Sequence, residues 1–212
     1  MEFALSEEQG ILSESIKKMF DENIGIDNLR DHSKGDKSLR RTIRRSIIDM
    51  GLPGLMIPEE YGGSGLGVLE ASLVAEQIGS YAVPSPWIGN SIMAPTAILF
   101  EKDNHLAEKW LPLIASGEIT ACISLSEVIG KRGHLGLTVN GDKVSGINIF
   151  GIDGELDPAI IITAVDNNLI LIETDNNGVE INEIPTIDST RPVVEIIFDS
   201  SNYVIIPGGK EA

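Results

Sequence analysis

The spacing of apolar residues changes near Gly117, and this change constrains the fold more than any other feature. Before Gly117, apolar residues recur three or four positions apart, which places them on one face of a helix. After it, apolar and polar residues alternate, as in a β-strand with one buried face. A helical first half followed by a second half of strands indicates the α+β class.

The first half predicts a series of helices. Ser6 and Gln9 match the capping box, in which each side chain hydrogen-bonds the other residue's backbone at the start of a helix. Later helices are expected over residues 38–50, 67–78, 87–100 and 105–115. Gly51 fits the C-terminal end of the first of these. The side chains expected to be buried are Leu39, Ile43, Ile47, Leu69, Leu73, Val74 and Ile78.

The second half predicts short strands separated by turns. Asn140-Gly141 is a typical two-residue turn of a β-hairpin. Strands are expected over residues 119–126, 135–139, 142–150, 159–164, 169–173, 179–184, 193–199 and 203–206. Short strands spaced in this way favour an antiparallel barrel or a sandwich.

Composition narrows the possible functions. The 212 residues contain 16 Lys and Arg against 32 Asp and Glu, a formal net charge of −16. A chain this acidic repels nucleic acid and anionic membranes, so we expect neither as a partner. The single cysteine, Cys122, cannot form an internal disulfide, and no Cys/His cluster has the spacing of a metal site. Neither a membrane span nor a secretory signal is evident, so we expect a cytoplasmic protein.

Basic side chains gather on the helix expected over residues 38–50. Arg40, Arg41, Arg44 and Arg45 lie opposite its apolar stripe. Charged side chains in this position typically form a solvated face, which is our expectation. A docking patch for a partner is the alternative.

The strand expected over residues 119–126 carries small polar side chains at alternate positions. They are Thr120, Cys122, Ser124 and Ser126, and they project from one face of the strand. Small side chains with hydroxyl and backbone N–H donors would suit a flat ring with polar atoms. The pattern is also typical of the solvent face of a sheet, and spacing alone favours that second interpretation.

Four segments, in order along the chain, resemble the acyl-CoA dehydrogenase family. They are Ile57-Pro58-Glu59-Glu60-Tyr61-Gly62-Gly63, Ser116-Gly117-Glu118 running into Ser124-Leu125-Ser126-Glu127, Val139-Asn140-Gly141-Asp142-Lys143, and Ile187-Asp188-Ser189-Thr190-Arg191-Pro192 ahead of Ile197-Phe198-Asp199. The last resembles a branch that includes bacterial steroid-degrading members. The resemblance covers nearly the whole chain, and it implies an all-α helical domain over residues 1–118 and an antiparallel β-barrel domain over residues 119–212.

The resemblance also implies a cofactor and a substrate. FAD would lie between the barrel and a C-terminal helical bundle, with an acyl-CoA thioester packed against the flavin. Ser124, Leu125 and Ser126 would contact the flavin through backbone and hydroxyl groups, and Ser126 keeps the hydroxyl of the threonine usual in the family. The family's catalytic glutamate belongs to the bundle, so no catalytic residue is expected within residues 1–212. Lys131-Arg132 stands where the family usually has Gly-Ser.

Three functions are compatible with this resemblance. The leading hypothesis is the N-terminal and middle part of an acyl-CoA dehydrogenase-like flavoprotein that carries out α,β-desaturation of an acyl-CoA. The second is a non-catalytic subunit that assembles with an active homologue. The third is a flavin-dependent monooxygenase on the same scaffold. A homologous subunit or the helical bundle is the implied partner, and an electron-transfer flavoprotein is a further possible one.

Overall fold

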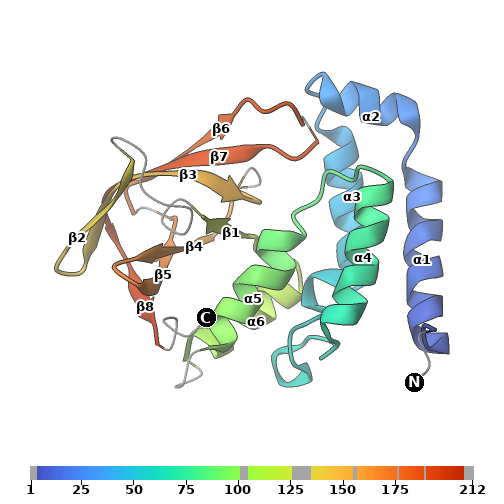
Figure 1. The fold of residues 1–212 in the computed structure, drawn as a ribbon, viewed down its shortest axis with the longest axis horizontal. Helices are drawn as coiled ribbons and strands as arrows, with labels where there is room; N and C mark the ends of the chain where they lie inside the picture. The colour runs from blue at the N-terminus through green and yellow to red at the C-terminus, as the bar shows by residue number, and fades with distance from the viewer. Residues whose placement is uncertain are drawn as a thin grey trace.

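The computed structural model describes residues 4–100, 105–125, 135–154, 157–175, 177–188 and 190–207. The helices occupy one side of the molecule and the strands the other (Figure 1). This arrangement confirms the α+β class. The division into domains at residue 118 stays a prediction, because side chains from both halves share one core.

The helical half contains six α-helices, two short 3₁₀ helices and one π-helical segment among the described residues. They are α1 Glu7–Asn23, α2 Ile26–Ser33, α3 Ser38–Asp49, η1 Leu52–Gly54, η2 Glu59–Tyr61, α4 Val68–Ser80, η3 Ile88–Met93, α5 Ala94–Leu99 and α6 His105–Ala115. The helix predicted over 87–100 is two elements, since η3 is a π-helical segment that continues into α5. The sequence did not predict α2, because only one apolar residue, Leu29, follows Ile26 within its span.

Local signals at the helix ends are confirmed. The Ser6 hydroxyl accepts a hydrogen bond from the Gln9 N–H at 3.2 Å, and the Gln9 side chain accepts one from the Ser6 N–H at 2.9 Å. Gly51 has a φ of 70°, the left-handed conformation expected just after a helix.

The helices α3 and α4 bury the apolar side chains that were predicted to be buried, with one exception. Leu69 is 53% exposed, so its predicted burial is wrong. The buried face of α4 runs through Ala71, Val74 and Ile78, at helical spacing, and Leu69 lies two positions before that line. These residues pack with Phe20 and Trp87 in the helical core.

The arginines of α3 do not all form a solvated face, so that prediction is wrong in part. Arg40 is only 4% exposed, and the Arg44 guanidinium donates a 2.8 Å hydrogen bond to the Gly117 carbonyl. Gly117, just after α6, lies against Arg44 and Ile48 of α3, which explains the contact of Arg44. Arg45 is exposed as expected.

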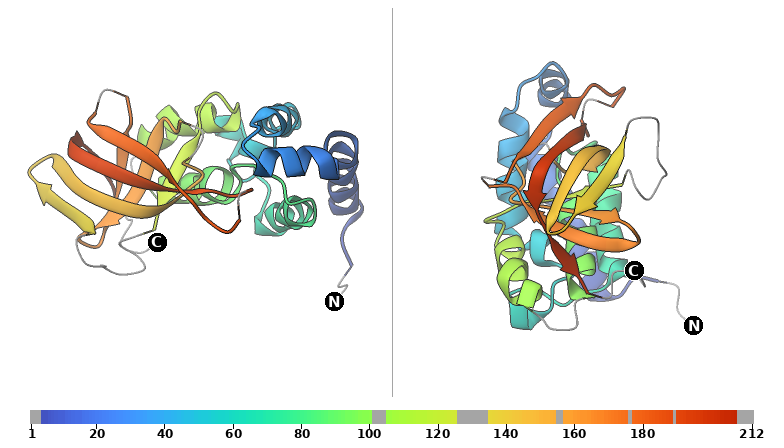
Figure 2. Two further views of the ribbon diagram at one scale, coloured as in Figure 1. Left: turned by 90° about the horizontal axis from the view of Figure 1, so that it is seen from above. Right: turned by 90° about the vertical axis from the view of Figure 1, so that its left-hand side faces the viewer.

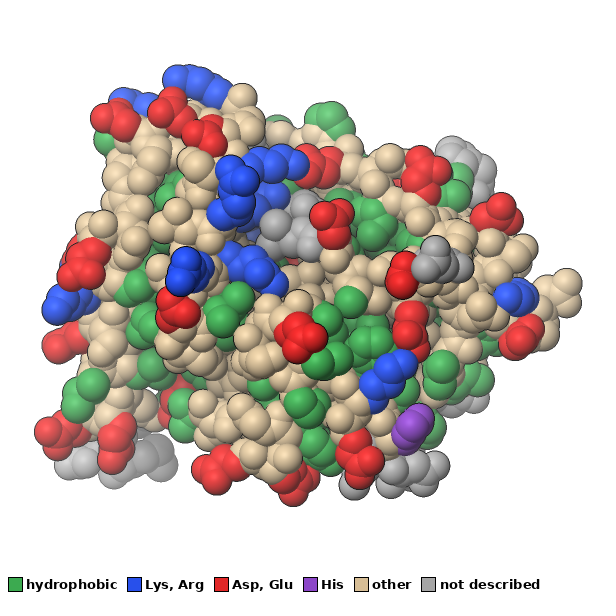
Figure 3. All heavy atoms as spheres, turned by 180° about the vertical axis from the view of Figure 1, so that it is seen from behind, with side chains coloured by type: hydrophobic (Ala, Val, Ile, Leu, Met, Phe, Trp, Pro, Cys, Tyr) green, Lys and Arg blue, Asp and Glu red, His purple; other side chains and the backbone are tan. Residues whose placement is uncertain are grey.

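Acidic side chains are spread over the face seen in Figure 3, several of them beside basic ones.

The strands form one mixed sheet that is mostly antiparallel. They are β1 Ala121–Ser124, β2 Gly136–Asn140, β3 Lys143–Ile152, β4 Ile160–Val165, β5 Asn168–Glu173, β6 Val179–Ile184, β7 Val193–Asn202 and β8 Val204–Ile206. Their order is β6-β7-β3-β1-β4-β5-β8, with β2 paired to β3. The predicted hairpin is confirmed, but its two turn residues are Gly141 and Asp142, one position later than expected, because Asn140 still pairs with Lys143. The expectation of an antiparallel sheet needs one correction, since β1 pairs with β4 in parallel.

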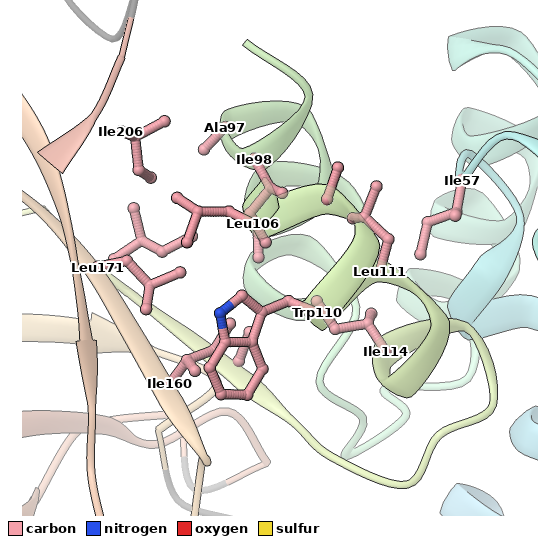
Figure 4. Close-up of a cluster of buried hydrophobic side chains, with 14 of the residues drawn as sticks. Ile57, Ala97, Ile98, Leu106, Trp110, Leu111, Ile114, Ile160, Leu171 and Ile206 are labelled. Carbon is pink, nitrogen blue, oxygen red and sulfur yellow. The ribbon is translucent and has the colours of Figure 1, made fainter. Parts of the chain in front are cut away.

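Two apolar cores flank the sheet. One lies between the sheet and helices α5 and α6, where Trp110 points toward Ile160 and Leu171 (Figure 4). The other lies within the curvature of the sheet itself, which is visible in Figure 2. No helix of the described chain is long and apolar enough to span a membrane.

Candidate functional site

A pocket of about 540 Å³ lies at the end of β1, between that strand, the helices and the turn after β4. Ser124 and Leu125, two of the three residues predicted to bind a cofactor, line it. Ser126, the third, lies outside the described residues, as do Lys131 and Arg132. The other lining residues are Ile92, Met93, Thr96, Ala97, Phe100, Ile123, Ile162, Thr163, Ala164, Asn167, Asn168 and Leu169.

Both faces of β1 are buried. Ala121 and Ile123 pack in the core shared with the helices, whereas Cys122 packs in the core of the sheet. Thr120, Cys122 and Ser124 are 5%, 0% and 2% exposed, so their face is not a solvent face. It is also not an open platform along its length, since only its end at Ser124 borders this pocket. The predicted row of small polar side chains is therefore confined to the edge of the site.

Buried polar groups lie beside this edge. The Asn148 Nδ2 donates to Thr163 Oγ1 at 2.8 Å, and the Thr163 hydroxyl donates to the Ser124 carbonyl at 3.3 Å. Ser124 Oγ and Asn148 Oδ1 have no hydrogen-bond partner among the described residues. Buried polar atoms are almost always paired, so the Ser124 hydroxyl, on a residue that lines the pocket, provides hydrogen-bonding capacity for a polar ligand. Asn148 is fully buried and does not line the pocket. Neither Asn148 nor Thr163 was predicted as a site residue, although Thr163 is the one polar residue within the apolar strand β4, which was a usable signal.

Segment η3 forms one wall of the pocket and is fixed to the sheet by buried hydrogen bonds. Asp153 Oδ2 accepts from the backbone N–H groups of Gly89 at 2.6 Å and Asn90 at 3.1 Å. Asn90 Oδ1 accepts from the Ala121 N–H at 2.9 Å. This network holds η3 against both β3 and β1, and η3 carries Met93 into the pocket wall.

The described lining of the pocket contains no ionisable side chain. It offers apolar contacts, hydroxyl and amide groups and backbone groups, which suit binding and orientation rather than proton transfer. The groups with shifted pKa values line other parts of the molecule: hydrogen bonds from Thr190 lower the pKa of Asp188, and a hydrogen bond from Gln9 lowers that of Glu70. No cluster of His, Cys, Asp or Glu suited to a metal ion occurs in the part of the chain that the structure describes.

Comparison with known proteins identifies the family. A model of the acyl-CoA dehydrogenase N-terminal domain matches residues 6–118, more than half of the chain. The chain therefore belongs to the acyl-CoA dehydrogenase family. Over 126 residues it is 33% identical to a mitochondrial isovaleryl-CoA dehydrogenase of Pongo abelii, a match that covers 58% of this chain and 30% of the relative. The chain thus matches about a third of that relative's length.

Solved structures of the same fold cover nearly all of the chain. One chain of the ChsE4–ChsE5 complex from Mycobacterium tuberculosis superposes with a TM-score of 0.83 at 19% sequence identity. The match covers 100% of this chain and 60% of the matched chain. A glutaryl-coenzyme A dehydrogenase in complex with glutaryl-CoA gives 0.80 at 20% identity, over 99% and 57%. At these identities the likeness establishes the fold, a helical part joined to a mixed sheet.

Proposed function

We propose that residues 1–212 form the helical and β-sheet part of an FAD-dependent acyl-CoA dehydrogenase, divided into domains at residues 1–118 and 119–212. The observation that carries the proposal is the pocket at the end of β1, which Ser124 and Leu125 line in a chain of this family. Its volume of about 540 Å³ is within the range of small-molecule sites.

The residues of the site fit a flavin ring in this proposal. Leu125 would provide apolar contact, and Ser124 would provide its unpaired hydroxyl group at the edge of the ring. Ser126, which lies outside the described residues, stays the third expected flavin contact. When bound, FAD supplies the acceptor for the hydride that leaves the acyl group during α,β-desaturation.

Proton abstraction requires a base from outside the described lining. A glutamate in a C-terminal helical bundle, from this protein or from a homologous partner, would take the α-proton. The ChsE4–ChsE5 complex, a solved complex that contains a chain of this fold, supports a partner arrangement. The alternative function, a non-catalytic subunit paired with an active homologue, is favoured by Lys131-Arg132, which replaces the Gly-Ser pair usual in the family.

Flavin titration of purified protein tests the proposal. The chain is produced alone and together with homologous subunits from its source, and bound FAD is measured from its visible absorbance. Leu125→Glu should abolish binding, because it places a charge in an apolar wall. Ile205→Glu, at a residue that is already 47% exposed on β8, is the matched control and should bind normally.

The results separate the three functions. Flavin in the lone chain favours a competent site, and flavin only in the assembled complex favours the partner subunit. Rapid reoxidation in air with hydroxylation of a substrate favours the monooxygenase. Equal FAD binding by wild type and Leu125→Glu would contradict the site itself.

A further inference from the structure

A second cavity, of about 300 Å³, lies between the start of η3 and the segment that leads into β7. It shares no lining residue with the pocket at the end of β1. Ile88, Ile152 and Val193 give it apolar walls, and Ser85, Asp153 and Arg191 give it polar groups. A volume of this size is at the lower end of the range for small-molecule sites.

Ser85 provides a buried hydroxyl to this cavity. The residue is 4% exposed, and its Oγ has no hydrogen-bond partner among the described residues. Buried hydroxyls in folded proteins are nearly always hydrogen-bonded. The Ser85 Oγ is therefore available to a ligand oxygen in the cavity.

Arg191 provides further donors. Its side chain is 33% exposed, and its Nη2 lies 3.8 Å from Asp153 Oδ1, which is beyond hydrogen-bond distance. A guanidinium carries five N–H donors in a fixed plane, so most of them remain for other acceptors. Asp153 is held in place through its other oxygen by the Gly89 and Asn90 N–H groups, which leaves the guanidinium beside the cavity rather than locked into a tight pair.

The charges around Arg191 determine what kind of acceptor fits. Asp153 lies on one side, and Asp188 is close enough for Arg191 to contribute to the lowering of its pKa, after the larger effect of Thr190. Two carboxylates already balance the single guanidinium. A ligand carboxylate or phosphate would meet a surplus of negative charge, whereas an uncharged oxygen would accept hydrogen bonds without that repulsion.

We propose that this cavity binds a compact, uncharged, apolar molecule through one carbonyl oxygen. The oxygen accepts hydrogen bonds from Ser85 Oγ and the Arg191 guanidinium, and the ligand body packs against Ile88, Ile152 and Val193. The proposal concerns a site apart from the flavin pocket. It does not depend on the proposed function.

Three probes of one shape test the chemistry with the full chain. They are 4-tert-butylcyclohexanone, its methylene analogue, which lacks the oxygen, and 4-tert-butylcyclohexanecarboxylate, which carries a charge. Binding is followed by NMR through the backbone amides of Gly89 and Asn90 and the indole of Trp87. The ketone should shift these signals and bind about tenfold more tightly than the methylene analogue, the effect of one or two hydrogen bonds. The carboxylate should bind more weakly than the ketone.

Variants connect the binding to the named side chains. Ser85→Ala and Arg191→Met should each weaken ketone binding several-fold and leave the methylene analogue unaffected, while Arg45→Met, at an exposed arginine of α3, should change neither. Ser85→Ala removes a single oxygen, so it tests the proposal even where Arg191→Met disturbs folding. Equal affinity of wild type for the ketone and the methylene analogue would overturn the proposal. Tighter binding of the carboxylate, or no shift at Gly89 and Asn90 with any probe, would do the same.

Discussion

Replacing Asp153 should destabilise the protein strongly, because this carboxylate joins the helices to the sheet. Its side chain is 4% exposed, so solvent screens its interactions little. In Asp153→Ala the N–H groups of Gly89 and Asn90 stay buried without an acceptor. Each orphaned N–H costs about 1–3 kcal/mol, and loss of a charged acceptor lies toward the upper end. We expect a total loss of about 3–5 kcal/mol in the free energy of unfolding.

Asp153→Asn is the informative companion variant. Asp153 has a φ of 61°, a left-handed conformation that asparagine adopts readily. Asparagine also keeps an acceptor oxygen at the same position, so only the charge is lost. Its cost should be about 1–2 kcal/mol, the difference between a charged and a neutral hydrogen bond made twice.

Urea and thermal denaturation measure both variants. For a chain of this size, about 1 kcal/mol corresponds to roughly 2–4 °C in Tm, so Asp153→Ala should melt roughly 6–20 °C below wild type. The Tm of Asp153→Asn should lie between those of wild type and Asp153→Ala. The reasoning is refuted if Asp153→Ala remains within about 1 kcal/mol of wild type, or if both variants lose the same stability.

Three further predictions concern other parts of the fold. Gly89→Ala should destabilise η3, because a Cβ at this position would lie 2.9 Å from the Ile152 carbonyl oxygen. Faster hydrogen exchange of the Asn90 backbone amide would show this loss of stability. Trp110→Ala should cost about 3–5 kcal/mol in urea unfolding, since the indole fills the core between α6 and the sheet. The pKa of Asp188 is lowered mainly by the Thr190 hydroxyl, so its contribution to stability is present above the unfolded pKa of about 4 and is lost as pH falls through the lower folded pKa. Thr190→Val should therefore flatten the stability-against-pH curve below about pH 4, and an unchanged curve would contradict this.

Local sequence signals predicted much of the fold. The capping box of α1 and the hairpin that turns at Gly141 depend on residues close in sequence, and both are confirmed, although the turn lies one residue later than predicted. The parallel pairing of β1 with β4 was not predictable, because it depends on which distant strands meet. The same holds for Arg40, whose burial results from packing of α3 against other segments rather than from its own helix.

The site was predictable only in part for the same reason. Ser124 and Leu125 lie on a strand whose alternation and family resemblance marked them, and they line the pocket. Asp153 and Asn90 act across more than 30 positions of sequence, through hydrogen bonds that no local pattern reports. Their role is visible only once the helices and the sheet are placed together.

The core between the helices and the sheet also sets the order in which the chain can complete its fold during synthesis. Trp110 and Ile114 emerge from the ribosome well before Ile160, Leu171 and Ile206, the strand residues that cover them. Until those strands arrive, α5 and α6 expose a continuous apolar surface, the kind that chaperones recognise and that promotes aggregation. The helical half is thus synthesised first, but its apolar surface on α5 and α6 is buried only after the strands follow. Slowing translation between residues 115 and 160 should lengthen the time for which this surface is exposed.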